Sequence, residues 1–182
     1  KTYMSLYGCL RLMAENVEKE LLYVRSIAES AERGLGSLPG DIAEKFNPFL
    51  MPLYDKLDEI VFEGDTAFLK NNGRISAIPI NFLRGANWSN KLIIADEAQN
   101  FTFKELTTLI TRLGEDSKLI ICGDFMQSDI NGKTGFNEMF DLFVDEESIK
   151  NGIHSFGFTR DDIVRSKILK FIISKLESYK KV

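Results

Sequence analysis

Residues 91–100 read Lys-Leu-Ile-Ile-Ala-Asp-Glu-Ala-Gln-Asn, and this stretch predicts the fold. Its first half is a short apolar run, which predicts a buried strand, and the run delivers two adjacent carboxylates, Asp96 and Glu97, to its C-terminal end. In an open sheet of parallel strands, ligands bind in the crevice outside the carboxyl ends of the strands. A strand that ends on two acids is therefore typical of an α/β protein with a polar site at that edge.

A second candidate strand ends in a similar way. The run 118–122 reads Lys-Leu-Ile-Ile-Cys, and Gly123 and Asp124 follow it, with Gln127 and Asp129 in the next turn. Because the carboxyl ends of parallel strands meet at one edge, both runs would place polar groups in the same crevice.

The start of the sequence adds a third polar pair. Lys1 and Thr2 are the residues that close the phosphate-binding motif G-x-x-x-x-G-K-[ST]. Apolar residues recur at helical spacing over 3–19, which predicts the helix that must follow such a loop. The three features together predict half of a nucleotide-hydrolysis site. The alternative is that Asp96 and Glu97 only cap the helix that follows them.

Strand and helix patterns alternate along the chain, which predicts a mostly parallel sheet with helices on both faces, a three-layer α/β/α arrangement. One domain is expected over 1–182. Prolines at Asn47-Pro48 and Pro52 predict that the helix over 41–60 is in two pieces, and glycines over 29–40 predict a functional loop. The expected strands are 20–24, 74–79, 91–95, 118–122 and 153–158, and the other expected helices are 62–69, 103–113, 136–143 and 161–180.

The composition excludes several classes of protein. The chain is 44% hydrophobic and 27% charged, which is typical of a globular domain. No apolar run approaches the roughly 20 residues of a membrane helix, so no membrane partner is expected. The net charge of −4 gives no general attraction to nucleic acid, so any such binding needs a local patch or an assembled oligomer.

The cysteine and histidine content excludes a zinc site. Cys9 and Cys122 are the only cysteines and His154 is the only histidine. Both cysteines lie among apolar residues, which predicts buried free thiols and a cytoplasmic, reducing location. Trp88 precedes the first acidic strand, and packing beside the sheet is expected for it rather than stacking on a base.

Several motifs occur in one order over nearly the whole chain, and together they resemble the PhoH-like P-loop ATPases, whose core is similar to that of RecA and superfamily 1 helicases. The resemblance implies a P-loop NTPase fold of that type. Members of this family are linked to phosphate starvation in bacteria, and relatives are frequent in phage genomes. The motifs are Lys1-Thr2, Arg25 with the loop Gly34–Asp41, Asn47–Asp55, Arg84-Gly85, Asp96–Asn100, Gly123-Asp124 with Gln127, and Asp162–Arg165.

The resemblance implies ATP and Mg²⁺ as ligands and ATP hydrolysis as the activity. Lys1 would contact the β- and γ-phosphates, while Thr2 and Asp96 would hold Mg²⁺, which needs few protein ligands. Glu97 would orient the attacking water, or act as its general base. Gln127 would sense the γ-phosphate, and Arg165 would be an arginine finger, acting in cis or from a neighbouring subunit. These roles have alternatives: a helix N-terminal acid for Glu97, a turn residue for Gln127, and an ion pair on a helix surface for Arg165.

The resemblance also implies partners. Arg25, Arg84 and Gln99 stand where helicase-like ATPases couple nucleotide to nucleic acid or to a neighbouring subunit, which makes RNA or single-stranded nucleic acid a candidate partner. An arginine finger in trans would imply a homo-oligomer, for example a hexameric ring. The same resemblance implies that the glycine part of the phosphate loop and the strand before it would precede Lys1.

Two rival functions remain open at the level of the sequence. The first is a nucleotide-binding switch or scaffold with little turnover, which would still bind nucleotide after Glu97→Gln. The second is an α/β interaction domain without a nucleotide, in which the two acids cap a helix. Gln127 and Arg165 disfavour the second rival, since a scaffold has no need of them.

Overall fold

The computed structural model describes part of the chain. The described residues are 1–26, 42–62, 64–83, 85, 87–125, 127, 134–159, 162, 164, 166, 168–172 and 175, with the backbone alone over 42–49. The chain divides into two compact units, Lys1–Leu142 and Phe143–Val182. The single domain expected over 1–182 stays a prediction.

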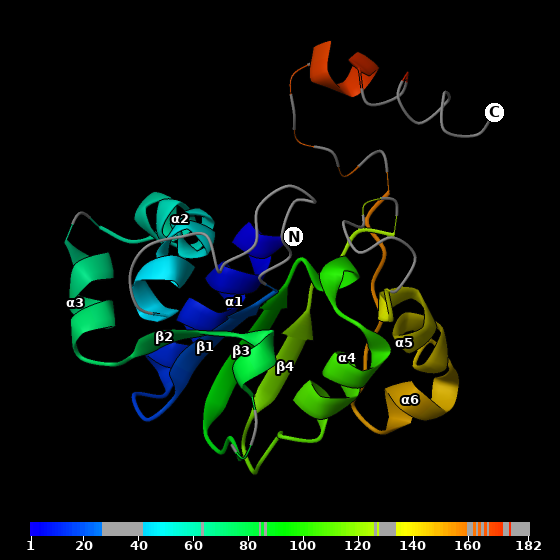
Figure 1. Cartoon of the computed structure of the whole chain (residues 1–182), viewed down its shortest axis with the longest axis horizontal. Coiled ribbons are helices and arrows are strands. Elements are labelled where there is room, and N and C mark those ends of the chain that lie inside the picture. The colour runs from blue at the N-terminus through cyan, green and yellow to red at the C-terminus, as the bar shows by residue number, and fades with distance from the viewer. Residues whose placement is uncertain are drawn as a thin grey trace. The chain divides into compact units, whose positions relative to one another are not determined.

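Among the described residues of the first unit, four parallel strands form a sheet, and their order across it is β2-β1-β3-β4 (Figure 1). Since all four run in one direction, their carboxyl ends lie on one edge, which is called the carboxyl edge below. The predicted α/β fold with a parallel sheet is confirmed. The strands are β1 (Glu20–Arg25), β2 (Ile75–Pro79), β3 (Lys91–Asp96) and β4 (Lys118–Ile121).

Two helices cover one face of this sheet. Leu6, Cys9 and Met13 of α1 (Thr2–Glu15) are buried in a cluster with Leu50, Leu53 and Leu57 of α2 (Ile42–Ile60). The cluster also holds side chains that alternate along the strands, Leu21, Tyr23, Ile75, Leu92 and Ile94. We refer to this set as the α1–α2 core.

The second face is buried as well. The side chains between those of the α1–α2 core point the opposite way, and they too are buried (Leu22, Val24, Ile93 and Ala95). The chain moves from β1 to β2 in one direction across the sheet and from β3 to β4 in the other. Right-handed crossovers therefore place α4 (Phe103–Ile110) on the face opposite α2. The expectation of helices on both faces is confirmed.

The predicted break in the second helix is wrong. The structure has one continuous helix of 19 residues, α2, which runs through both Pro48 and Pro52. Each proline removes a single backbone hydrogen bond. Burial of Leu50, Leu53 and Leu57 against α1 holds the helix together across that loss.

Other elements of the first unit match the prediction with shifted ends. α1 ends at Glu15 rather than at 19, where Asn16 takes an extended backbone conformation. α4 ends at Ile110 rather than at 113, and Leu113 instead forms a bridge with Trp88. The remaining helices in the described part of this unit are α3 (Asp65–Asn71), η2 (Ile80–Phe82), η3 (Ala98–Asn100) and α5 (Phe136–Leu142).

The second unit differs from the prediction at its start. Residues Glu146–Lys150, for which no helix was predicted, form α6, whose N-cap is Asp145. The strand predicted over 153–158 is not formed, and Ile153, Phe156 and Phe158 are exposed. A strand is stabilised by burying one face against its neighbours, and these apolar side chains are not buried in that way. Of the helix predicted over 161–180, the structure describes helical residues at 168–172 and 175.

The helices of the described part were compared with the length and hydropathy of a bilayer span. None of them combines enough residues with enough apolar character to cross a membrane.

Candidate active site

The ends of three strands bring the candidate site together at the carboxyl edge. In the register of the sheet, Arg25 at the end of β1 lies opposite Asp96 at the end of β3. On the other side of β3, Ala95 pairs with Ile121, so the turn that follows β4 begins beside Asp96. The sheet thus places the two acidic strand ends side by side, as the sequence predicted.

Asp96 and Thr2 are in direct contact at this edge. The Thr2 hydroxyl lies 2.9 Å from Oδ1 and 3.0 Å from Oδ2 of Asp96, and it donates to the carboxylate. Thr2 is the first residue of α1, and the packing of Leu6 and Cys9 in the α1–α2 core sets where that helix begins. Asp96 itself is only 4% exposed, and a buried polar group needs hydrogen-bond partners such as these.

Tyr23 is a member of this group that sequence reasoning missed. Its phenolic hydroxyl donates to Oδ2 of Asp96 at 2.6 Å, and its side chain is fully buried. Burial raises the pKa of Tyr23 above the usual range of tyrosine, and the charge of Asp96 raises it further, so the hydroxyl keeps its proton. A buried tyrosine hydroxyl needs a partner. The tyrosine in the apolar run Leu21–Val24 was the available signal, but its partner depends on strand register.

Lys1 lies at the turn that follows β4. Its ammonium group donates to the backbone carbonyl of Gly123 at 2.9 Å and lies 3.4 Å from Oδ2 of Asp124. Both side chains of this ion pair are about a third exposed (37% and 33%), and ion pairs at that exposure are weak. An anion that enters the carboxyl edge could therefore compete for the Lys1 ammonium.

Glu97 is held by Gln99. The residue adopts a left-handed backbone conformation with φ 53°, which ends the extended run of β3. The Gln99 amide nitrogen donates to Oε2 of Glu97 at 2.5 Å, and the Gln99 amide oxygen accepts from the backbone N–H of Asp124 at 2.9 Å. Gln99 is 3% exposed. It is thus a buried bridge between the second acid and the turn after β4.

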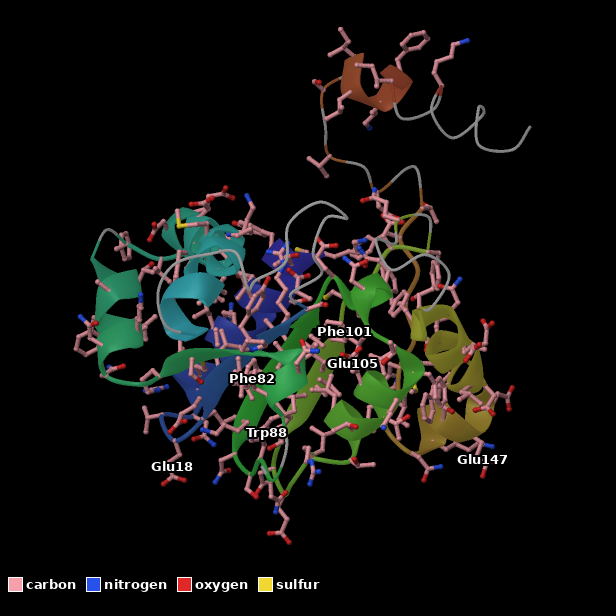
Figure 2. All side chains as sticks on the ribbon, in the orientation of Figure 1. Glu18, Phe82, Trp88, Phe101, Glu105 and Glu147 are labelled. Carbon is pink, nitrogen blue, oxygen red and sulfur yellow. The ribbon has the colours of Figure 1, made fainter. Side chains whose placement is uncertain are left out.

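The helix-capping alternative for the two acids finds no support in these contacts. The 3₁₀ helix η3 that follows Glu97 has no side-chain cap. The next helix, α4, is capped by Thr102, which forms a reciprocal capping box with Glu105. Figure 2 labels Glu105 at the start of that helix. Asp96 and Glu97 are bonded to Thr2, Tyr23 and Gln99 instead.

The remaining predicted residues fall into two groups. Gln127 is exposed in the turn after β4, where its backbone N–H is 3.4 Å from the Asp124 carbonyl, and Arg25 ends β1 next to Asp96. Arg84 and Arg165 lie outside the described residues.

Trp88 lies away from the carboxyl edge. It is 7% exposed and comes just before β3, at the end of the sheet where the strands begin (Figure 2). Its backbone is bonded to Arg112 and Gly114. The expectation that Trp88 packs beside the sheet is confirmed.

The two cysteines are free and buried, as predicted. Burial raises the pKa of the Cys9 thiol to about 12. Burial also raises the pKa of Cys122, whose sulfur lies 3.1 Å from the Ser5 hydroxyl. Thiols that stay protonated are poor nucleophiles. Neither cysteine therefore suits a catalytic role at the adjacent site.

The donor set at the carboxyl edge fits a magnesium ion. Thr2 and Asp96 supply oxygen atoms alone, and Mg²⁺ binds through one or two protein oxygens, several waters and substrate phosphates. Among the described residues, no group of three or more histidine, cysteine or acidic side chains could hold a metal by itself. A sparse oxygen pair of this kind suits an ion that arrives with a phosphate ligand.

Comparison with known proteins matches nearly the whole sequence of this chain to one family. The family model described as PhoH-like protein matches residues 1–177. The chain is 35% identical to the PhoH-like protein of Bacillus subtilis over 185 residues, which covers 100% of this chain and 55% of that protein. It is 33% identical over 179 residues to the PhoH-like protein of Synechocystis, covering 97% of this chain and 53% of the relative. With protein PhoH of Escherichia coli K12 it shares 32% identity over 175 residues, 92% of this chain and 47% of that protein. The chain thus spans about half the length of these curated relatives.

Proposed function

We propose that this chain, which belongs to the PhoH-like protein family, binds ATP with Mg²⁺ and hydrolyses it. Membership of this P-loop ATPase family supports a nucleotide-binding, ATPase-type function at a coarse level. The observation that carries the finer proposal is the contact of the Thr2 hydroxyl with both oxygens of Asp96. A hydroxyl at a helix start beside a strand-end carboxylate is the pair that holds Mg²⁺ in P-loop NTPases.

In this mechanism Lys1 is the phosphate-binding cation. Its ammonium would leave the Gly123 carbonyl and the Asp124 carboxylate for the β- and γ-phosphates, which carry more negative charge than a single carboxylate. Thr2 and Asp96 would hold Mg²⁺, which when bound would neutralise charge on the same phosphates.

Glu97 has the role of orienting the water that attacks the γ-phosphate. The hydrogen bond from Gln99 fixes one oxygen of its carboxylate, so the other oxygen can accept a proton from that water. Gln127, in the turn after β4, would contact the γ-phosphate. Arg165 would supply positive charge in the transition state, from this chain or from a neighbouring copy in a homo-oligomer.

Coupling to RNA or to single-stranded nucleic acid is a further part of the proposal. Its support is the similarity of the family core to helicases, together with two polar side chains at the carboxyl edge, Arg25 and Gln99. The net charge of −4 argues against binding through bulk electrostatics. Coupling would therefore act through the site edge itself.

Steady-state ATP hydrolysis by the full-length protein, with and without single-stranded RNA, tests this proposal. We expect Glu97→Gln to lower kcat by about 10²-fold or more, since general-base contributions have that size. Glu18→Gln is the matched control, because Glu18 is exposed at the opposite end of the sheet (Figure 2). Its rate should equal that of the unmodified protein.

The possible results separate the rival functions. Nucleotide binding with negligible turnover in the unmodified protein would favour a switch or scaffold. Turnover that is lost in Glu97→Gln but does not respond to RNA would keep the ATPase and refute the coupling. Absence of both binding and turnover would refute the proposed function.

A further inference from the structure

We propose that Tyr23 is a positioning residue that holds the Asp96 carboxylate for Mg²⁺, an inference that rests on the proposed function. The 2.6 Å hydrogen bond from the Tyr23 hydroxyl to Oδ2 is the shortest that Asp96 accepts among the described residues. A hydrogen bond to a charged oxygen is stronger than one between neutral groups, and burial strengthens it further. Tyr23 therefore contributes strongly to the orientation of this carboxylate.

The position of the Tyr23 hydroxyl is itself rigid. Tyr23 lies in the middle of β1, where its backbone pairs with Ala77 of β2 on one side and Ile94 of β3 on the other. Its ring is fully buried in the α1–α2 core. A group held by its packing in this way keeps a site in one geometry. The hydroxyl cannot follow Asp96 if the carboxylate turns, so the bond favours a single rotamer.

Thr2 cannot provide this restraint alone. Its one hydroxyl proton is shared between Oδ1 and Oδ2, at 2.9 Å and 3.0 Å, so the carboxylate could rotate without losing the bond. Thr2 is also the first residue of α1, and in the proposed site its hydroxyl oxygen would itself bind the metal. Tyr23 holds Oδ2 from inside the α1–α2 core, because its ring is buried there.

The chemistry of the phenol suits a carboxylate that must bind a cation. A lysine or arginine in this place would neutralise Asp96, whereas a tyrosine hydroxyl donates a hydrogen bond and leaves the negative charge for the metal. With one lone pair of Oδ2 engaged, binding of a metal by both oxygens at once is disfavoured. Contact through one oxygen or through a bound water suits the strict octahedral geometry of Mg²⁺, while Ca²⁺ accepts bidentate carboxylates.

Metal binding to Tyr23→Phe in the full-length protein tests the inference. Mn²⁺ serves as the probe, and its electron paramagnetic resonance signal is titrated in the presence of ADP, so that no turnover is required. We expect Mn²⁺ to bind about tenfold more weakly than in the unmodified protein, the size typical of losing a group that orients a metal ligand. Competition by Mg²⁺ and Ca²⁺ should show a shift in preference toward Ca²⁺.

Tyr7→Phe is the matched control. It removes the same oxygen from a tyrosine that is exposed on α1, and it should leave Mn²⁺ binding unchanged. Tyr23 replaced by 4-aminophenylalanine keeps a donor at the same place, and we expect its Mn²⁺ affinity to lie closer to that of the unmodified protein than to Tyr23→Phe. This variant also keeps the test decisive if Tyr23→Phe folds poorly.

The results distinguish a failure of the inference from a failure of the proposed function. If the unmodified protein binds no Mn²⁺ with ADP, or if Asp96→Asn binds it equally well, the proposed metal site is wrong. If Asp96→Asn loses Mn²⁺ while Tyr23→Phe keeps the original affinity and the original preference for Mg²⁺, the role of Tyr23 is refuted. If the 4-aminophenylalanine variant binds Mn²⁺ as weakly as Tyr23→Phe does, the loss does not come from the missing hydrogen-bond donor, and the role of Tyr23 is also refuted.

Discussion

Single side chains at the carboxyl edge act in two connected groups. Thr2 and Tyr23 both donate to Asp96, and Gln99 joins Glu97 to the backbone of Asp124. In each group a neutral donor satisfies a carboxylate that is wholly or partly buried. Such donors satisfy the hydrogen-bonding needs of the carboxylates without adding a positive charge beside them.

The two thiols beside this edge should be unreactive. With a pKa of about 12 for Cys9, the thiolate fraction at pH 8 is on the order of 10⁻⁴, and the pKa of Cys122 is raised as well. We expect iodoacetamide at pH 8 to leave both residues unmodified in the folded protein, as measured by mass spectrometry of the peptides that contain them. The same reagent in 6 M guanidinium chloride provides the control, and there both should react. Rapid labelling of the folded protein at either cysteine would contradict the buried, protonated state.

At the scale of elements, close packing of backbones holds the start of α5 against the start of α4. The backbone N–H of Gly135 donates to the Phe101 carbonyl at 2.8 Å. A Cβ atom on Gly135 would lie 2.1 Å from the backbone nitrogen of Phe103, which neither residue can avoid without a shift of the main chain. Glycine at 135 therefore sets how closely the start of α5 can pack against the segment that follows Asp96 and Glu97.

A pair of glycine substitutions tests this packing. Gly135→Ala should lower the free energy of unfolding by about 1–3 kcal/mol, because the added methyl group overlaps backbone atoms. Gly8→Ala is the matched change, since Gly8 lies inside α1 with nothing within 4 Å of the added carbon. It should raise stability by roughly 0.5–1 kcal/mol through helix propensity. Thermal or urea unfolding measures both, and equal effects of the two substitutions would refute the distinction.

At the scale of the whole molecule, the direction of the crossovers decides where the site forms. The chain runs outward from β1 to β2 on one side of the sheet and from β3 to β4 on the other (Figure 1). The strands β1 and β3 are therefore central neighbours, and side chains from both reach the same crevice. Ligands bind in open α/β sheets where the strand order reverses in this way. The described side chains of the candidate site belong to the unit Lys1–Leu142.

Ligand binding at this crevice should stabilise the full-length protein. A ligand that binds only the folded state, at 100 times its Kd, adds about 2.7 kcal/mol. We expect ADP with Mg²⁺ to raise the melting temperature by several degrees, and we expect Thr2→Ala to lose the part of that rise that depends on Mg²⁺. Thr107→Ala is the control, because Thr107 is an exposed residue of α4 that bonds only within its own helix. A rise that is the same with EDTA and with Mg²⁺ would contradict the metal site.

Features of the fold that depend on neighbouring residues were predicted correctly, whereas those that depend on contacts between distant residues were not. The parallel α/β sheet, its four strands and the two acidic strand ends were all predictable, since they follow from patterns within a few residues. The continuity of α2 through its prolines was not, because core packing of Leu50 and Leu53 overrides a local signal. The strand predicted over 153–158 is not formed. The local apolar pattern suggested it, but such a pattern cannot show whether a neighbouring strand is present to pair with. The roles of Gln127 and Arg165 stay predictions.

By itself, the sequence determined the α/β class, the position of Asp96 and Glu97 at a strand end, and the motifs shared with the PhoH-like proteins, because each of these is written in residues close together along the chain. The tertiary structure alone decided which side chains meet at the carboxyl edge. Tyr23 and Asp96 are 73 residues apart in sequence, and Lys1 is 122 residues from Gly123. Such contacts follow from the order and register of the strands, which are set by burial on both faces of the sheet and not by any local pattern.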